Sequence, residues 1–121
     1  MTKTKINFNS KLKSINDYWS PKVIAELNDY QFKLAKIKDE FIWHEHNDTD
    51  EAFVVIKGNI EIELEDRTIE LSEGEMFVVP KGAKHKPIAK GEAHIMLIEP
   101  RGVKNTGDIE NELTAKNDIW I

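Results

Sequence analysis

The sequence predicts a single all-β domain, a jelly roll or related closed β-barrel, preceded by a short helical segment. Short runs of β-branched and aromatic residues recur along the chain, separated by turn residues every eight to twelve positions. In residues 60–65, isoleucine or leucine alternates with glutamate, which is typical of a strand with one buried face. A chain of 121 residues, 40% apolar, suits one domain. About nine strands in so short a chain close best into a barrel, because closure leaves few free edges.

The predicted elements follow in order along the chain. A short helix is expected over residues 9–18, with Asn9 or Ser10 as its N-cap and Leu12 and Ile15 on one face. Strands are expected near residues 22–27, 30–38, 41–46, 51–57, 59–65, 68–71, 75–79, 84–89 and 93–99. One domain, 1–121, would therefore comprise an N-terminal segment 1–21, a barrel over about 22–100 and a tail 101–121.

Side-chain alternation predicts which strand faces are buried. Tyr30, Phe32 and Leu34 alternate with polar residues and are expected in the core or the cavity wall. The runs AFVVI (52–56) and HIMLI (94–98) are apolar at every position or nearly so, and strands of this kind are covered on both faces. They are expected in the middle of the barrel.

Composition excludes several classes of protein. The chain carries 17 Lys and Arg against 22 Asp and Glu, a net charge of −5, and its middle third is strongly acidic, which disfavours a nucleic acid as partner. The longest apolar run has five residues, far too few to cross a membrane. There is no cysteine, so a metal would be bound by nitrogen and oxygen. The N-terminus does not resemble a secretory signal, and we expect a cytoplasmic protein.

The first chemically informative segment is residues 43–51, WHEHNDTDE. On a strand, residues two apart point to the same side, so His44 and His46 would present their rings together. The polar turn after them would return the chain antiparallel and bring Glu51 beside the two histidines, with Phe53 on the same inner face. A helical H-E-x-x-H zinc site is excluded, because the position it requires is Asp48.

The second segment is residues 74–85, GEMFVVPKGAKH. Gly74 and Gly82 suit tight turns, and Pro80 ends a strand. His85 then opens the next strand. A single histidine of this kind is more often structural or exposed than functional. His85 becomes a candidate site residue only when it is considered together with the first segment.

Together the two segments resemble the paired motifs of the cupin superfamily. The first motif has the form H-x-H, four residues, Glu, six residues, Gly, and is matched by His44, His46, Glu51 and Gly58. The second has the form Gly, five residues, Pro, one residue, Gly, two residues, His, and is matched by Gly74, Pro80, Gly82 and His85. The chain departs from the family pattern at Lys38, where a glycine is usual, and at Ala89, where an asparagine is frequent.

This resemblance implies a small single-domain, conserved-barrel cupin (cupin 2, RmlC-like) that binds a divalent transition metal. The implied ligands are His44, His46, Glu51 and His85, with one or two positions open to water or substrate. Ligand chemistry favours Fe, Mn, Ni, Zn or Cu over Ca and Mg, and leaves the metal's identity open. Members of the family that lost their metal also lost ligands, whereas all four are present here.

The resemblance further implies a metal-dependent enzyme of isomerase, lyase or dioxygenase type, acting on a small oxygenated or sugar-like molecule in the barrel. It also implies a homodimer. The alternatives are a non-catalytic barrel that binds or senses a small molecule or a metal, and a protein that works through its dimer surface, with a structural metal. No catalytic group is evident beyond Glu51 and His94, and the favoured interpretation of His94 is a hydrogen-bonded core histidine. Lys81, Lys84 and Lys86 either attract an anionic substrate or belong to a solvated loop.

Overall fold

Seven antiparallel strands and one short helix make up the computed structural model of the protein, which describes residues 3–108 and 110–121. The predicted all-β fold is confirmed. The elements are α1 (Phe8–Leu12), β1 (Lys22–Leu27), β2 (Tyr30–Glu40), β3 (Glu51–Lys57), β4 (Ile60–Leu64), β5 (Thr68–Leu71), β6 (Met76–Val79) and β7 (His85–Pro100).

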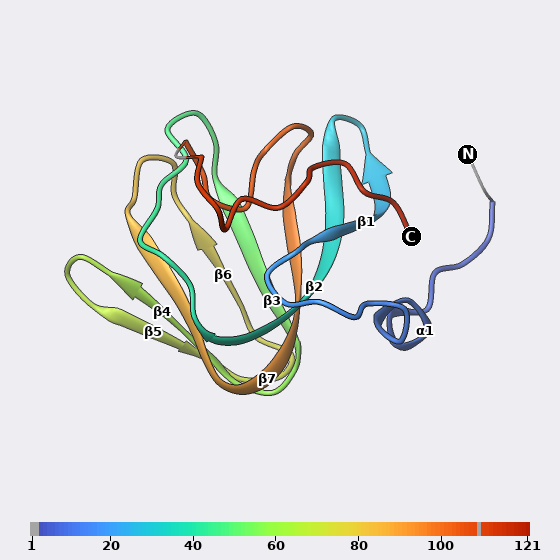
Figure 1. Ribbon diagram of the computed structural model, residues 1–121, viewed down its shortest axis with the longest axis horizontal. Helices are drawn as coiled ribbons and strands as arrows, with labels where there is room; N and C mark the ends of the chain where they lie inside the picture. The colour runs from blue at the N-terminus through green and yellow to red at the C-terminus, as the bar shows by residue number, and fades with distance from the viewer. Residues whose placement is uncertain (1–2, 109) are drawn as a thin grey trace.

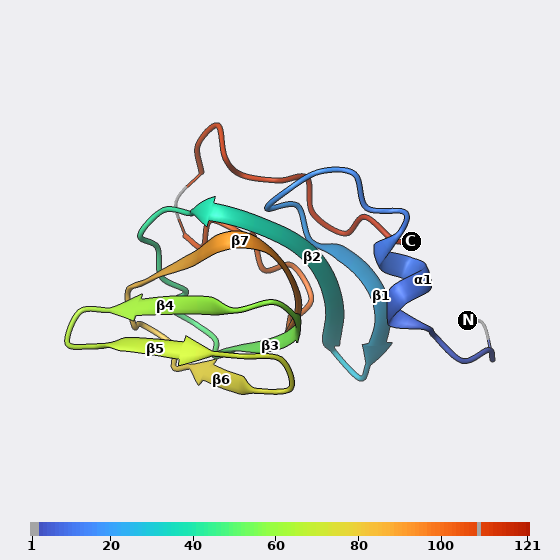
Figure 2. The same cartoon turned by 90° about the horizontal axis from the view of Figure 1, so that it is seen from below.

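The barrel is closed by β7, a long strand that belongs to both of its walls. One wall has the order β1-β2-β7-β3-β6, and the other pairs β5 with β4 and β4 with the first part of β7. Figures 1 and 2 show β4 and β5 on the opposite side of the barrel from β1 and β2. The two strands predicted at 84–89 and 93–99 are therefore one strand, which bends at the exposed residues 90–92.

Two hydrophobic clusters stabilise the structure, one inside the barrel and one outside it. The inner cluster is built mainly from residues of β2, β3, β4 and β7, among them Ile37, Val55, Ile62 and Ile95. The outer cluster lies between α1 and β1 and β2, and contains Leu12, Ile15, Ile24 and Leu34. The second cluster explains the N-terminal segment, because α1 covers a sheet face that would otherwise be in water.

The prediction for β2 is confirmed for Leu34, which is fully buried in a core cluster, but it is wrong for Tyr30, and the polar residues of the strand are buried as well. Gln31 and Lys33 point into the barrel and are buried, whereas Tyr30 is half exposed on the outside. Phe32 and Leu34 also point outward, where they pack in the outer cluster beneath α1 and the last residue of the chain. Long-range covering by the two ends of the chain thus decides the orientation, and alternation within the strand does not reveal it.

The helix is shorter than predicted. It begins after Asn7, whose side-chain oxygen accepts a hydrogen bond from Ser10 N at 3.0 Å, and it ends at Leu12. The expected N-cap, Asn9 or Ser10, was two to three residues too late, although Leu12 and Ile15 are buried together as predicted. No helix among the described residues has the length and apolar character needed to span a membrane.

The segment 41–46 is the other element that was predicted wrongly. It is no regular strand, and its ladder consists of a single bridge between His44 and His85. Asp39 adopts φ 65, and the pairing of β2 with β7 shifts register just before it; Asp39 and Glu40 still pair with β7, and regular pairing ends after Glu40. The segment nevertheless runs beside the start of β7, because His44 and His85 exchange backbone hydrogen bonds of 3.0 and 2.9 Å.

The C-terminal tail crosses one end of the barrel and then returns to β1 (Figure 1). Near its start, Asp108 N donates to Glu45 O at 3.1 Å and the Asp108 carboxylate accepts from Asn47 N at 2.9 Å. Near its end, Val23 exchanges backbone hydrogen bonds with residues 119 and 121. The tail is therefore fixed at both sides of the opening.

Candidate metal centre

Three histidines and one glutamate meet inside the end of the barrel that the tail crosses. One potential ligand atom from each of His44, His46, Glu51 and His85 lies within 4.8 Å of all the others. Two come from the 41–46 segment, one from the first residue of β3 and one from the first residue of β7. All four residues are at most 5% exposed. The structure thus brings together the whole predicted ligand set.

Backbone carbonyls orient two of the three imidazoles. Nδ1 of His44 lies 2.9 Å from Ile42 O, and Nδ1 of His85 lies 2.9 Å from Ala83 O. A carbonyl oxygen only accepts, so Nδ1 carries a proton in both rings, and Nε2 of the neutral ring has the lone pair that a metal would bind. Hydrogen bonds of this kind are the usual support of a metal-ligating histidine. In each case the carbonyl belongs to the residue two before the histidine, so the support is built into the local chain.

The remaining geometry fits a metal. Nε2 of His46 and Nε2 of His85 each lie 3.3 Å from Oε1 of Glu51. His46 Nε2 is buried and makes no well-formed hydrogen bond to any described residue. Donor atoms at bonding distance from a tetrahedral zinc ion would lie about 3.4 Å from one another, so these two contacts already have a suitable separation, and a contraction of the set, whose atoms now lie within 4.8 Å, would bring all four to bonding distance.

Burial and mutual contact shift the ionisation of the cluster in a direction that suits metal binding. Burial, together with the neighbouring His85, lowers the pKa of His44 to about 4. Burial opposes ionisation of Glu51, but the contacts with His46 and His85 outweigh it and hold the pKa of the carboxyl below its usual range. At neutral pH, His44 therefore offers a lone pair and Glu51 a negative charge.

The neighbours of Glu51 differ from the prediction. We expected the histidine segment to pair with the strand of Glu51, but β3 pairs with β6, where Glu51 faces Val79, and with β7. Glu51 and Phe53 do share the inner face as predicted. The histidine segment reaches Glu51 across the barrel interior, because its own neighbour is the start of β7.

A second buried polar group beside the cluster was missed in the sequence. Leu97 pairs with Phe53, so Glu99 lies next to Glu51 on the inner face. Burial and the negative charge of Glu51 raise the pKa of Glu99 well above its usual range. Lys33 approaches from β2, with Nζ 3.9 Å from Glu99 Oε2 and 3.1 Å from a tail carbonyl. The polar residues Gln31, Lys33 and Glu99 would have indicated this group in the sequence only if it had been known which faces of β2 and β7 point inward.

His94, the second catalytic candidate, lies outside this site. Its neighbours Ala93 and Ile95 face the interior, and its own ring faces outward and is partly exposed. Its Nε2 lies 2.7 Å from Oε2 of Glu92, an exposed residue at the bend of β7. It is therefore a hydrogen-bonded histidine of the outer face, neither a core residue nor a group aimed at the ligands.

The lysines near His85 also point away from the cluster. Lys81 and Lys84 are exposed, and Lys86 Nζ lies 2.7 Å from Glu40 Oε1. Lys86 also lies over the ring of Trp43, 5.8 Å from its centroid. Lys86 thus has surface partners in Glu40 and Trp43, and Lys81 and Lys84 lie in an exposed loop.

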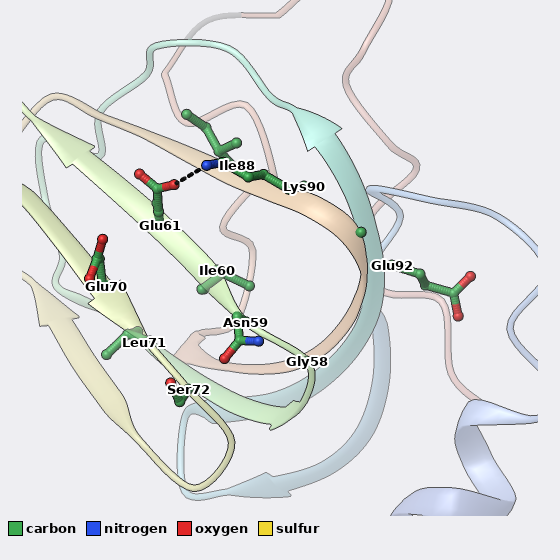
Figure 3. A pocket seen from close by; sticks show the side chains of 11 residues that line it. Gly58, Asn59, Ile60, Glu61, Glu70, Leu71, Ser72, Ile88, Lys90 and Glu92 are labelled. Atoms are coloured by element: carbon green, nitrogen blue, oxygen red, sulfur yellow. Dashed lines mark ion pairs between the residues drawn. The ribbon is translucent and has the colours of Figure 1, made fainter.

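A small cavity adjoins the metal cluster. Its volume is about 30 Å³, and His44 and Glu51 form part of its wall. A larger surface groove of about 470 Å³ lies on the outside of the barrel between β4, β5 and the bend of β7, as Figure 3 shows. There Glu61 and Lys90 form an ion pair of 3.8 Å, and the side chain of Glu92 points away from the groove. None of the four clustered ligands lines that groove.

Comparisons with known proteins agree with this architecture. The family model of the cupin domain matches residues 31–101. A crystal structure of a cupin-2 domain containing protein from Shewanella frigidimarina NCIMB 400 is 59% identical, with a TM-score of 0.78, and the match covers 79% of this chain and 94% of that chain.

Two curated relatives share only part of their length with this chain. YdbB, an uncharacterised protein of Bacillus subtilis, is 38% identical over 64 residues, which are 52% of this chain and 57% of that protein. SSO1533 of Saccharolobus solfataricus, whose name suggests a dioxygenase, is 26% identical over 106 residues, which are 85% of this chain and 28% of that protein. The chain thus spans about half or less of the curated relatives that it matches.

Proposed function

The chain belongs to the cupin domain family, and on that premise we propose that it is a metal-dependent enzyme of isomerase, lyase or dioxygenase type. Its substrate is a small oxygenated molecule that enters the barrel. The observation that carries this proposal is the buried cluster of three imidazoles and one carboxylate within 4.8 Å of one another. A structural role alone would not require the adjoining cavity at His44 and Glu51.

His44, His46, Glu51 and His85 would hold a divalent transition metal, and nitrogen and oxygen donors of this kind suit Fe, Mn, Ni, Zn or Cu. A bound metal would supply Lewis acidity or activation of dioxygen. The chain's own part is to keep the ligand set dry and to orient it, through the hydrogen bonds of His44 and His85 to backbone carbonyls. The dioxygenase type is supported by the name of the Saccharolobus relative.

Metal analysis of the purified protein tests the first step of the proposal. We expect about one equivalent of transition metal in the wild type and little in His85→Ala or Glu51→Ala, because each variant loses one of four ligands. His94→Ala is the matched control, since this histidine lies on the outer face and should leave the metal content unchanged. Stoichiometric metal that survives both ligand substitutions would remove the proposed site.

Turnover then separates an enzyme from a binding barrel. The alternative, a non-catalytic barrel, is supported by one observation: among the described residues, the cavity wall offers no acid or base besides the ligands His44 and Glu51. Consumption of dioxygen, or conversion of a small oxygenated compound, by the metal-loaded protein favours the enzyme. Saturable binding without any conversion favours the alternative.

The homodimer implied by the resemblance and the cytoplasmic location expected from the N-terminal sequence stay predictions. The apolar side chains of β6 provide a candidate surface for a second copy, since Met76 and Val78 are about half exposed on its outer face. Light scattering or analytical ultracentrifugation of the full chain measures the oligomeric state directly.

A further inference from the structure

We propose that the molecule admitted to the metal centre carries its metal-binding oxygen group on an otherwise apolar body, and that polyhydroxylated compounds such as sugars are rejected. This inference rests on the proposed function, and it narrows the substrate class. Three features of the cavity support this inference: the apolar character of its wall, the hydrogen bonds made by Asn105, and the stacked aromatic rings of Trp19 and Phe41.

The wall of the cavity is almost entirely apolar. Nine of its twelve residues are apolar, and they come from the N-terminal segment, from β2, β3 and β7, and from the segment that follows β2. They are Trp19, Pro21, Ala35, Ile37, Phe41, Phe53, Pro87, Ile95 and Leu97. The polar remainder consists of His44 and Glu51, which belong to the metal cluster, and Asn105 from the tail.

The side chain of Asn105 makes three hydrogen bonds to the protein backbone. Its side-chain nitrogen donates to Trp19 O at 2.9 Å and to Leu113 O at 3.0 Å. Its side-chain oxygen accepts from Ala115 N at 2.8 Å. One donor of the amide therefore joins the tail to the N-terminal segment and the other bonds within the tail, so Asn105 has no N–H left to donate to a ligand.

The other buried polar residues nearby do not line the cavity. Lys33 and Glu99 are buried on the inner face, but neither belongs to the wall. Lys33 directs its ammonium group to Val103 O in the tail. A hydroxyl on the body of a ligand would consequently find no partner in the wall beyond the metal ligands.

Trp19 forms the aromatic cover of the cavity. Its ring stacks on Phe41 with centroids 4.7 Å apart, and Phe41 meets the ring of His44 edge-on at 5.4 Å. Trp19 adopts φ 58, an uncommon conformation for a bulky residue. Two hydrogen bonds hold it there: its backbone N–H donates to Lys36 O, and its indole N–H donates to Lys38 O. Aromatic surface thus extends from the outside to a metal ligand.

The size of the cavity indicates that this cover must move. A volume of about 30 Å³ holds roughly two water molecules. An organic ligand therefore displaces Trp19 or the Asn105 contact as it enters, and its body then lies against Phe41, Phe53 and Leu97. Each ligand hydroxyl that loses water without gaining a partner should weaken binding about ten-fold or more.

The test compares two carboxylates of equal size, pentanoate and 4-hydroxybutanoate, which differ in a terminal methyl or hydroxyl group. The protein is loaded with Zn²⁺, which accepts these ligands and has no redox chemistry, and its metal content is verified. Trp43 and Trp120, both largely exposed, are changed to Phe so that Trp19 reports alone. Binding is followed by Trp19 emission and by calorimetry.

We expect pentanoate to bind at least about ten-fold more tightly than 4-hydroxybutanoate and glucuronate not to compete. Equal affinities, preferential binding of glucuronate, or no binding of either acid to the zinc-loaded protein would overturn the inference. Failure to load zinc would instead count against the proposed function, so the two failures are distinguishable.

A pair of variants checks that the cavity wall sets the preference. Ala35→Ser adds a hydroxyl to the wall, and we expect it to reduce the preference for pentanoate several-fold. Ala89→Ser is the matched control, because Ala89 is equally buried in a strand but lies outside the wall. Melting temperatures verify that both variants are folded. An unchanged preference in Ala35→Ser, or an equal change in both, would contradict the assignment.

Discussion

Gly107 in the C-terminal tail packs against the backbone of the segment that carries the ligands His44 and His46. Replacing Gly107 with alanine tests that contact. A Cβ atom at Gly107 would collide with the backbone oxygen of Glu45, the residue between the ligands His44 and His46. Gly102 provides a matched control, because it lies in the same tail, also has a positive φ, and has open space around a Cβ. The pair separates the cost of the backbone conformation from the cost of the contact.

The magnitudes follow from these two terms. An alanine in the left-handed region costs about 1–2 kcal/mol, and this term applies to Gly102→Ala (φ 93) and Gly107→Ala (φ 69) alike. Overpacking against a fixed neighbour costs about 1–3 kcal/mol more, and only Gly107→Ala incurs it. We therefore expect Gly107→Ala to lower the unfolding free energy by about 2–5 kcal/mol and Gly102→Ala by about 1–2 kcal/mol.

Urea denaturation of the metal-free variants measures these differences, and competition with a chelator measures their zinc affinity. Gly107→Ala should also weaken zinc binding, since relief of the collision displaces either the tail or the segment of His44 and His46. Gly102→Ala should bind zinc as the wild type does. Equal stabilities and equal zinc affinities of the two variants would refute the reasoning that the tail supports the metal centre.

Four further predictions concern the site and the surface. Between pH 6.5 and 4, His44 takes up a proton in the unfolded chain but stays neutral in the folded protein, because its pKa there is about 4. The unfolding free energy of the metal-free protein should therefore decrease by up to about 3 kcal/mol as the pH is lowered from 6.5 to 4. A pH-independent unfolding free energy in urea titrations would contradict this. Chelation should lower the melting temperature by roughly 10 °C if the metal is present at about a thousand times its Kd, and no shift after verified metal removal would argue against a stabilising site. His94→Gln should change the unfolding free energy by less than about 1 kcal/mol, because it loses only a contact with exposed Glu92, and a larger loss would indicate a role that the structure does not show. Val78→Lys should give a monomer by light scattering if the outer face of β6 contacts a second copy, whereas an unchanged dimer would place the interface elsewhere.

The metal ligands could be predicted because the spacing of the two segments matches the paired cupin motifs. Local alternation accounts for one part of the set: His44 and His46 are both buried, whereas Trp43 before them is exposed, even though the segment is no regular strand. The hairpin of β4 and β5 could be predicted for a similar reason, and Leu64 N donates to Arg67 O across the expected turn. Turn residues and two-residue alternation act over a few positions, so a single sequence contains them.

The second buried polar group could not be predicted in this way. Gln31 and Lys33 face the interior only because α1 and the last residue of the chain cover the opposite face of β2. Glu99 lies beside Glu51 only because β7 pairs with β3 in one particular register. Neither fact has a local signal, since the same alternating pattern permits either face to be buried.

By itself, the sequence of this protein determined an all-β barrel and the absence of thiol ligands, because composition and short-range patterns suffice for these, and its resemblance to the cupin motifs implied a set of three histidines and one glutamate. Only the tertiary structure decided that the space beside the ligands is apolar and closed by Trp19 and Asn105. Residues from both ends of the chain and from three strands form that wall, and long-range packing alone brings them together. The chemistry of the ligand atoms is thus local, whereas the selection of what reaches them is a property of the fold.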